Sequence, residues 1–341
     1  MKTLTACAAA LLLLTAAPAT AAPMTEAEAA LIVERGDRDK RDTDLDDSRM
    51  PARALAFARL EGGDRVLDMF AGGGYYTELL ARAVGPDGRV IAQNPAAFGA
   101  RERIKAAVEQ RNYGERVPNA AVMNVDFMQM QLAPSSIDRA FFHLVYHDLY
   151  FESAEFGLPR TEPQIVLSEL HRALRPGGSI TVIDHVGDGD DPRTDVQATH
   201  RIKPDIVLND FRKAGFRLAA REAFFDNPAD NHAKSVFDPA LRGKTDRFAM
   251  RFVKAGDPGA EETAAADIPA YGAGECDASA VADFLGKMPS AVDPDTLKRA
   301  FSASMLRMHK SGDAVTMDFR TDRVNVETSP ETGEIVRIYC G

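Results

Sequence analysis

Residues 65–76 read Arg-Val-Leu-Asp-Met-Phe-Ala-Gly-Gly-Gly-Tyr-Tyr, and this stretch decides the fold of the chain. Its apolar start predicts a β-strand that ends near Asp68, and the three glycines predict a tight turn. Apolar residues then recur at helical spacing, so we expect a helix over residues 75–84. A glycine turn between a strand and a helix lets a ligand approach the backbone closely, beside the unpaired N–H groups of the first helical turn. No Gly-Lys-Ser/Thr follows, which argues against a phosphate-binding P-loop.

Strand and helix patterns alternate from residue 65 to residue 254. Strands are predicted over 65–69, 89–93, 120–125, 137–144, 179–184, 217–223 and 247–254, and helices over 75–84, 98–111, 164–174 and 204–214. This alternation predicts an α/β fold with a doubly wound, mostly parallel seven-stranded sheet and helices on both faces. Residues 23–64 form a charged N-terminal arm, and residues 255–274 form a linker rich in Gly, Ala, Pro and Glu. Residues 275–341 form a separate, small α+β domain, in which we expect a helix over 293–303 capped by Asp293 and strands over 304–309, 323–327 and 334–339.

Ligands bind at the carboxyl ends of the strands in such a sheet, and polar residues stand at these predicted ends. His147 and His185 are candidate general bases because imidazole titrates near neutral pH, and Asp148 and Asp184 would orient them. The alternative is that each histidine is a hydrogen-bonded structural group. The pair His200-Arg201, which follows the fifth strand, is a candidate for binding an anionic substrate. No cysteine–histidine cluster has zinc spacing, so no metal site is predicted.

The run from Leu67 to Gly74 resembles the first motif of class I S-adenosylmethionine-dependent methyltransferases, and residues 175–178 (Arg-Pro-Gly-Gly) resemble their late turn before strand five. The resemblance covers residues 45–254 and implies S-adenosylmethionine as the cofactor. It implies that Asn94 would bind the ribose hydroxyls, where the family usually has an acidic residue. Phe70 departs from the family because it stands where the motif usually has its first glycine. The cofactor-binding residues implied by the motifs are Asp68, Ala71, Gly72, Gly74 and Asn94, with Asp126 and Phe127 at the adenine.

A closer resemblance is to a group of predicted bacterial methyltransferases with signal peptides. Its motifs appear here as 146–148 (Tyr-His-Asp), 184–185 (Asp-His), 227–230 (Asn-Pro-Ala-Asp), 236–238 (Val-Phe-Asp) and 242–248 (Arg-Gly-Lys-Thr-Asp-Arg-Phe). This group implies a fold and a cofactor but no substrate, so the methyl acceptor stays an unspecified small molecule.

The C-terminal segment 315–325 (Val-Thr-Met-Asp-Phe-Arg-Thr-Asp-Arg-Val-Asn) resembles the binding loop of potato-inhibitor-I-like serine peptidase inhibitors, in particular their small disulfide-bonded bacterial and fungal branch. The resemblance implies Met317–Asp318 as the reactive bond and a serine peptidase as the partner. Arg323 would brace the loop through Thr316 and Asp318. Asn325 stands where some relatives have a second bracing arginine, which predicts a softer loop. The alternative is a stable accessory domain that inhibits nothing.

Residues 1–22 have the features of a secretory signal peptide: Lys2 at the start, an apolar run with four consecutive leucines, and the small residues 19–21 (Ala-Thr-Ala). The sequence thus predicts an exported protein, periplasmic or secreted, with no membrane association after cleavage. Cys276 and Cys340 would then remain as an even pair, which suggests a disulfide. The net charge of −10 argues against general nucleic-acid binding.

The sequence therefore predicts an exported methyltransferase-like enzyme joined to an inhibitor-like domain. Because S-adenosylmethionine is scarce in exported compartments as usually understood, a second hypothesis stays open. In that hypothesis an inactive methyltransferase fold displays a peptidase-binding domain.

Overall fold

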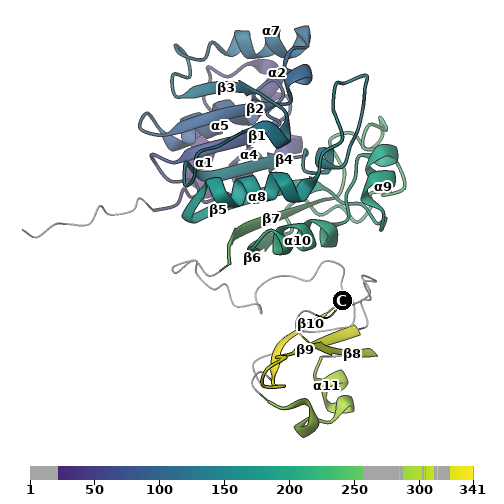
Figure 1. Cartoon of the computed structure of the whole chain (residues 1–341). Coiled ribbons are helices and arrows are strands. Elements are labelled where there is room, and N and C mark those ends of the chain that lie inside the picture. Colours follow the sequence, from purple (N-terminus) through teal and green to yellow (C-terminus); the bar gives the residue numbers. More distant parts are fainter. Residues whose placement is uncertain are drawn as a thin grey trace, which may run out of the picture.

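The computed structural model describes residues 22–255, 284, 287–301, 303, 305–310, 313 and 323–340. Its larger sheet has seven strands in the order β3-β2-β1-β4-β5-β7-β6, and only β7 runs antiparallel to its neighbours (Figure 1). The strands are β1 (Arg65–Met69), β2 (Arg89–Asn94), β3 (Ala120–Asn124), β4 (Ile137–His143), β5 (Leu174–His185), β6 (Phe216–Glu222) and β7 (Arg247–Lys254). The predicted mostly parallel, seven-stranded α/β sheet is confirmed.

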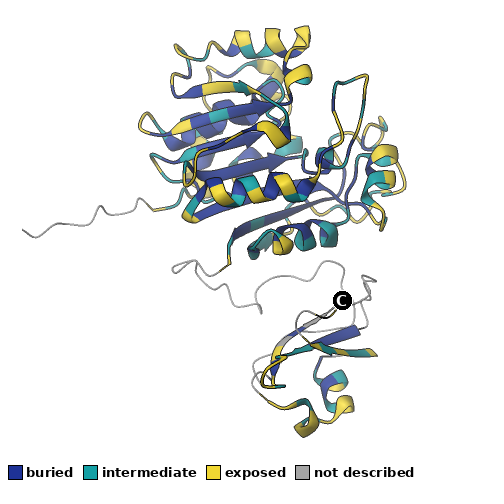
Figure 2. Ribbon diagram, in the orientation of Figure 1, coloured by how far each residue is buried: buried dark blue, intermediate teal, exposed yellow. Residues whose placement is uncertain are grey.

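Helices cover both faces of this sheet, because successive residues of each strand point to opposite sides. Val66 packs with α4 (Pro51–Phe57) and α5 (Tyr75–Val84), while the next residue, Leu67, packs in the second apolar cluster with α8 (Pro163–Ala173) and α10 (Pro204–Lys213). Figure 2 shows the result: the strands are largely buried and the outer sides of the helices are exposed. The central strands β1, β4 and β5 are therefore buried along most of their length, whereas the outer strands β3 and β6 are partly exposed.

Two predicted elements differ from the structure. The predicted helix over 98–111 is divided into α6 (Ala96–Gly99) and α7 (Glu102–Arg111). The Pro-Gly-Gly turn at 176–178 lies inside β5, whose residue Leu174 already pairs with Ile137, while Ser179 pairs with Arg139. Four residues thus bulge out against one on β4, and Gly177 there has a left-handed φ of 73°.

The charged N-terminal arm folds onto the domain as α1 (Glu26–Val33), α2 (Lys40–Thr43) and α3 (Asp46–Arg49), followed by α4. Its charges are largely paired: Arg38 binds Asp46 at 2.7 Å, and Asp42 receives a bidentate hydrogen-bonded pair from Arg111 of α7. Pairing with the domain offsets the cost of burying these charges, so the arm forms part of the methyltransferase-like unit.

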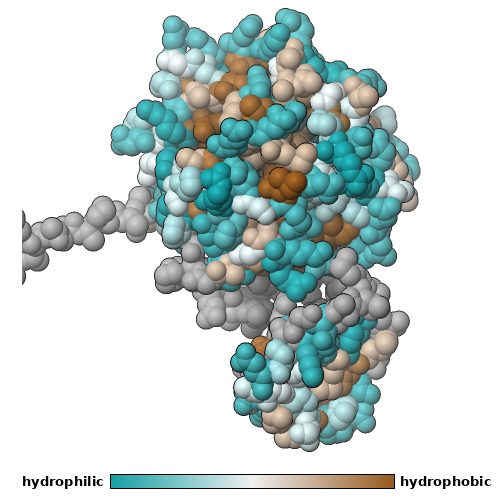
Figure 3. Space-filling model, in the orientation of Figure 1, coloured by the Kyte–Doolittle hydropathy of each residue, from teal (hydrophilic) through white to brown (hydrophobic). Residues whose placement is uncertain are grey.

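The remaining short elements are η1 (Phe127–Gln129), η2 (His147–Leu149) and α9 (Pro192–Thr199). No helix is predicted from the sequence over 192–199. Asp191 caps this helix by accepting from Arg193 N, and His200 ends it in the left-handed region. Among the described residues, none of the helices has the length and apolar character that a membrane crossing needs. The face drawn in Figure 3 is mostly hydrophilic, with scattered apolar residues.

The C-terminal domain, described by itself, has η5 (Pro289–Ala291), α11 (Pro294–Ala300) and a three-stranded sheet of order β10-β9-β8. Its strands are β8 (Met305–Lys310), β9 (Arg323–Thr328) and β10 (Ile335–Cys340), each within a residue of the prediction. Asp293 caps α11 by accepting from Thr296 N at 3.0 Å, as its position predicted. Because β8 and β9 are parallel, the end of β8 and the start of β9 lie at opposite ends of the sheet.

Candidate functional site

A cavity of about 620 Å³ lies where the order of the sheet reverses, between β1 and β4. Its wall includes residues 68–73 at and after the end of β1, residues 143–145 at the end of β4, parts of the N-terminal arm, and α7. Ligands of doubly wound sheets bind at this switch point, and the volume suits a nucleoside-sized cofactor. The glycine run thus lines a real cavity in the position that the sequence predicted.

The end of β2 holds the glycine turn in place. Gln93 accepts from Phe70 N with its side-chain oxygen and from Ala71 N with its backbone oxygen. Asn94 uses both atoms of its amide on Gly72, accepting from the backbone N–H at 2.8 Å and donating to the carbonyl at 3.2 Å. Asn94 is fully buried and does not line the cavity. The structure therefore corrects its predicted role: Asn94 shapes the turn instead of presenting its amide to a ribose.

Two glycines of the turn serve different purposes. Gly72 has a φ of +56°, and a Cβ added to it would meet nothing within 4 Å. Gly74 has a φ of +83°, and its added Cβ would lie 2.2 Å from the Tyr113 hydroxyl. Gly72 therefore leaves space for a ligand, whereas Gly74 allows α5 and the Arg111–Tyr113 segment to pack closely.

Phe70 keeps the backbone conformation that the motif's first glycine would adopt, with a φ of 50°. Its ring packs edge-on against Phe98, with centroids 4.6 Å apart, and against Phe127, with centroids 5.6 Å apart. Phe70 lines the cavity and Phe127 does not. The departure from the family motif thus preserves the turn and adds an aromatic side chain to the cavity wall.

Asp68 is a buried carboxylate on the cavity wall. Thr77 of α5 donates a hydrogen bond to it at 2.6 Å. Burial raises the pKa of Asp68 to about 7, although the Thr77 hydrogen bond and the positive charges of Arg111 and Arg49 act in the opposite direction. A cationic group in the cavity would compensate this desolvation.

The other predicted cofactor residues take different places. Ala71 lines the cavity, and Asp126 accepts from Ala96 N at 3.0 Å, which joins the end of β3 to the start of α6. Asp126 and Phe127 lie outside the cavity wall. Of the seven predicted cofactor residues, the cavity wall contains Asp68, Ala71 and Gly72.

Most cavity residues were not among the predicted site residues, and two of them, Arg49 and His143, bear on ligand binding. Arg49 of α3 places its guanidinium 4.3 Å from the centre of the Tyr75 ring, and no carboxylate among the described residues pairs with it. His143, at the end of β4, packs against Tyr76 with the two ring centroids 4.3 Å apart, and its buried Nε2 has no hydrogen-bond partner among the described residues. Burial, together with the charges of Arg49 and Arg247, lowers the pKa of His143 well below its ordinary value. Its position at a strand end was a signal for His143, whereas nothing local pointed to Arg49.

The four predicted catalytic residues lie together, but none of them lines the cavity. His147 hydrogen-bonds through Nδ1 to Asp184 at 2.8 Å, and its backbone N–H donates to the other oxygen of that carboxylate. His185 hydrogen-bonds through Nδ1 to the Thr245 hydroxyl at 2.7 Å. Asp148 lies 3.8 Å from His147 Nε2. The predicted His–Asp pairing therefore forms between His147 and Asp184, across the ends of β4 and β5.

In this group, burial and neighbouring charges shift the pKa values of the side chains in opposite directions. Burial lowers the pKa of His147, but Asp184 and Asp148 outweigh it and raise that pKa to about 9. Burial raises the pKa of Asp148 to about 6 despite the nearby His147. Burial, with the charge of His147, lowers the pKa of His185 well below its ordinary value. At neutral pH His147 is thus held as a cation between carboxylates, which makes it a poor proton acceptor.

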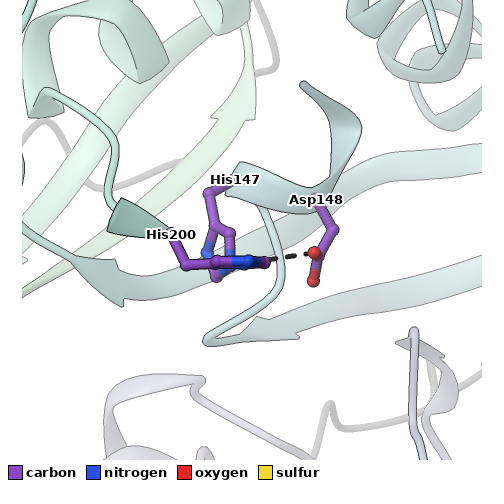
Figure 4. Close-up of side chains that lie close together, drawn as sticks. All are labelled: His147, Asp148 and His200. Carbon is purple, nitrogen blue, oxygen red and sulfur yellow. Dashed lines mark ion pairs between the residues drawn. The ribbon is translucent and has the colours of Figure 1, made fainter. Parts of the chain in front are cut away.

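His200 joins His147 and Asp148 in a group that the sequence did not predict (Figure 4). The potential ligand atoms of the three side chains all lie within 4.8 Å of one another. The neighbouring Arg201 is fully buried in a bidentate pair with Asp230, at 2.7 and 3.0 Å. This pairing corrects the suggestion that Arg201 binds an anionic substrate, because its charge is already neutralised.

In the C-terminal domain, Arg323 begins β9 and is buried, and its bracing of the loop stays a prediction. Asn325 is fully buried and accepts a hydrogen bond at 2.7 Å from Arg307 Nε on the adjacent strand. The predicted Met317–Asp318 bond, its support Thr316, and the Cys276–Cys340 disulfide lie outside the residues or side chains that the structure describes. These remain predictions.

Comparisons with known proteins agree with both halves of this description. A model of the methyltransferase domain family matches residues 67–182, and a model of the peptidase inhibitor I78 family matches residues 276–341. An arsenite methyltransferase of Halobacterium salinarum is 30% identical over 186 residues, covering 54% of this chain and 44% of that protein. The aligned part thus spans less than half of that relative.

Two solved structures are also similar. A methyltransferase dependent on S-adenosylmethionine from Aquifex aeolicus matches with a TM-score of 0.43 and 20% identity, over 67% of this chain and 98% of that one. An arsenic (III) S-adenosylmethionine methyltransferase from Chlamydomonas reinhardtii matches with a TM-score of 0.40 and 20% identity, over 58% and 65% of the two chains. Residues 67–182 thus match a methyltransferase domain, and residues 276–341 match a peptidase inhibitor domain of the I78 family.

Proposed function

We propose that the larger domain transfers a methyl group from S-adenosylmethionine to a small-molecule acceptor. The observation that carries this proposal is the cavity at the β1/β4 switch point, whose wall combines the open turn at Gly72 with Asp68 and Arg49. The bound cofactor would supply an electrophilic methyl group on a sulfonium. Asp68 would accept hydrogen bonds from the cofactor's ammonium group, and Arg49 would pair with its carboxylate.

His143 is the residue we assign to the acceptor side. His143 lines the cavity at the end of β4, and its buried Nε2 has no hydrogen-bond partner among the described residues. Burial keeps the pKa of the ring low, so the ring is neutral. A neutral imidazole can accept a hydrogen bond from an acceptor hydroxyl, thiol or amine and so orient that group toward the methyl carbon. The two predicted bases, His147 and His185, use Nδ1 on Asp184 and Thr245.

The acceptor we propose is not arsenite held by thiolates, although the halobacterial relative is named for arsenite. The cysteines of this chain are Cys7, Cys276 and Cys340, so the methyltransferase domain has none. Thiolates are the protein ligands that suit soft, thiol-seeking centres. An organic acceptor with an ionisable proton fits His143 better.

Calorimetry of the full chain with S-adenosylmethionine tests the cofactor part of the proposal. We expect saturable binding that Arg49→Met weakens about tenfold or more, because a charge-assisted contact is lost. Arg89→Met is the matched control, since Arg89 is an exposed residue at the opposite end of β2. No heat from a folded protein would favour the second hypothesis, a non-catalytic scaffold for the inhibitor domain.

For the smaller domain we propose inhibition of a serine peptidase through the Met317–Asp318 bond. Support comes from the I78 family match and from the buried Arg323 at the start of β9, next to the predicted loop. A braced loop binds tightly because little conformational entropy is lost. We expect the full chain to slow a subtilisin- or elastase-like peptidase, and Met317→Lys to change which peptidase is slowed. Unchanged proteolysis with excess protein would contradict this.

We also propose that the protein is exported, supported by the signal-peptide pattern of residues 1–22. Fractionation of cells that express the full chain, compared with a chain starting at residue 23, tests this. Equal retention of both chains in the cytoplasm would contradict export.

A further inference from the structure

The group formed by His147, Asp148 and His200 has the chemistry of a metal centre. Two imidazole rings and one carboxylate converge from two separate elements, η2 and the end of α9 (Figure 4). Their potential ligand atoms lie within 4.8 Å of one another, and the closest measured pair, His147 Nε2 and Asp148 Oδ1, is 3.8 Å apart. None of the three residues lines the cofactor cavity, so the group is a separate feature of the domain.

Asp184 fixes the orientation of the His147 ring. Asp184 takes the Nδ1 side of the ring and also accepts from the His147 backbone N–H, both at 2.8 Å. Asp184 is fully buried at the end of β5 and accepts from His185 N as well. A carboxylate on one ring nitrogen, with the other nitrogen directed at a shared point, is the arrangement that orients metal-binding histidines.

The other two side chains have unused polar atoms. Among the described residues, no hydrogen bond reaches the Asp148 carboxylate or either ring nitrogen of His200, and the contact of Asp148 with His147 is an ion pair. Aromatic rings position His200 instead: its centroid lies 4.4 Å from that of Phe151 and 4.8 Å from that of Phe237. Partly buried polar atoms without partners are costly, and a bound cation would satisfy them together.

The segment between β6 and β7 helps to build the surroundings of this group. Phe237 packs on His200, Asp230 neutralises the adjacent Arg201, and Val236 N donates to Thr199 O at 3.0 Å. These contacts place the left-handed His200, whose φ is 54°, opposite His147. The motifs at 227–230 and 236–238, which the proposed methyl transfer does not use, thus contribute to the surroundings of this group.

We propose that His147, Asp148 and His200 bind one divalent transition-metal ion. Metal binding at His147 Nε2 releases to solvent the proton that Asp184 and Asp148 otherwise stabilise on this ring. Two nitrogen ligands and one oxygen ligand suit zinc, cobalt(II) or iron(II), whereas magnesium and calcium prefer oxygen-only sites. Ligands on a zinc-like ion lie roughly 3 Å apart, so Asp148 and His200, which are both half-buried, would close slightly around it. Three protein ligands leave at least one position for water or for a ligand with an oxygen, nitrogen or sulfur donor. This inference does not depend on methyl transfer.

Cobalt(II) titration of the chelator-treated full chain, followed by visible ligand-field absorption and displaced by zinc, tests the proposal. We expect one equivalent to bind, His200→Ala and Asp148→Asn each to abolish the signal, and Asp184→Asn to weaken binding about 10- to 100-fold. His232→Ala is the matched control, because His232 lies between Asp188 and Asp246 and outside this group. Replacing Cys276 and Cys340 by serine should leave the signal unchanged.

A second measurement needs no chromophore. Zinc should raise the thermal unfolding temperature of the wild-type chain and of His232→Ala, but not that of His200→Ala or Asp148→Asn. If one of these two variants fails to fold without metal, the other decides. Absence of cobalt binding, or binding unchanged in the ligand variants or lost in the cysteine variant, would overturn the proposal. Because neither assay contains S-adenosylmethionine, their failure is distinct from failure of the methyltransferase proposal.

Discussion

Asn94 at the end of β2 holds Gly72 with both atoms of its side-chain amide, at 2.8 and 3.2 Å. This contact joins two neighbouring strand ends and fixes the turn that lines the cofactor cavity. An aspartate at this position could accept from the Gly72 N–H but could not donate to its carbonyl oxygen.

Asn94→Asp should therefore destabilise the protein without improving cofactor binding. The new carboxylate would be fully buried and would face a carbonyl oxygen, so we expect a loss of about 1–3 kcal/mol in the free energy of unfolding. Denaturant unfolding and calorimetry measure the two effects. Asn124→Asp, at the exposed end of β3, is the control. Tighter cofactor binding by Asn94→Asp would show that this position contacts the ribose after all.

The two glycines Gly72 and Gly74 should separate binding from folding. Gly72→Ala meets open space, so it should cost only about 1 kcal/mol for its positive φ while reducing cofactor affinity. Gly74→Ala would bring its Cβ to 2.2 Å from the Tyr113 hydroxyl and should destabilise by several times as much. Thermal unfolding with and without S-adenosylmethionine distinguishes them. Equal unfolding temperatures for the two variants would refute this division of roles.

Asp68 should make stability depend on pH in an unusual direction. Its folded pKa of about 7 lies above its ordinary value of 3.8, so its contribution to stability is fully present below pH 4 and is lost as pH rises through 7. Comparison with Asp68→Asn isolates this effect: relative to the variant, the wild-type chain should become less stable between pH 4 and pH 8. Urea unfolding across that range measures the difference. A difference that does not change with pH would contradict a raised pKa.

The Arg201–Asp230 pair should be structural. Both side chains are fully buried, so Arg201→Met would leave Asp230 without its charge partner and should cost about 3–5 kcal/mol. The double variant Arg201→Met/Asp230→Leu should recover much of that loss, because it removes both buried charges. Denaturant unfolding of the single and double variants measures this. A stable Arg201→Met chain would reopen the suggestion that Arg201 binds an anion.

Asn325 should stabilise the inhibitor domain and support its predicted loop. It accepts from Arg307 Nε at 2.7 Å within a buried part of the sheet, so Asn325→Ala should cost about 1–3 kcal/mol and loosen the base of the predicted loop. We expect faster cleavage of the variant by the peptidase that the wild-type chain slows. Thr332→Ala, on an exposed turn, serves as the control. Identical cleavage rates for Asn325→Ala and the wild-type chain would argue against a supporting role.

Local sequence patterns determined much of the secondary structure of this protein. The strand, glycine turn and helix over 65–84 lie where periodicity and turn chemistry put them, because each depends on neighbouring residues only. The same holds for the capped α11 and the three short strands of the C-terminal domain. The ends of β1, β4 and β5 could also be expected to meet, since parallel strands share one carboxyl edge.

Only the tertiary structure decided which polar side chains remain available to bind a ligand. Asn94 and Arg201 use their side chains on Gly72 and Asp230, while the buried Nε2 of His143, a residue of the cavity wall, has no hydrogen-bond partner among the described residues. Arg49 reaches that cavity because the charged arm folds back as helices, paired with residues far along the chain. His200 meets His147 because the segment between β6 and β7 holds the end of α9, which lies against η2. Hydrogen bonding and burial between distant segments carry no local periodic signal, so the strand ends were predictable and the chemistry at them was not.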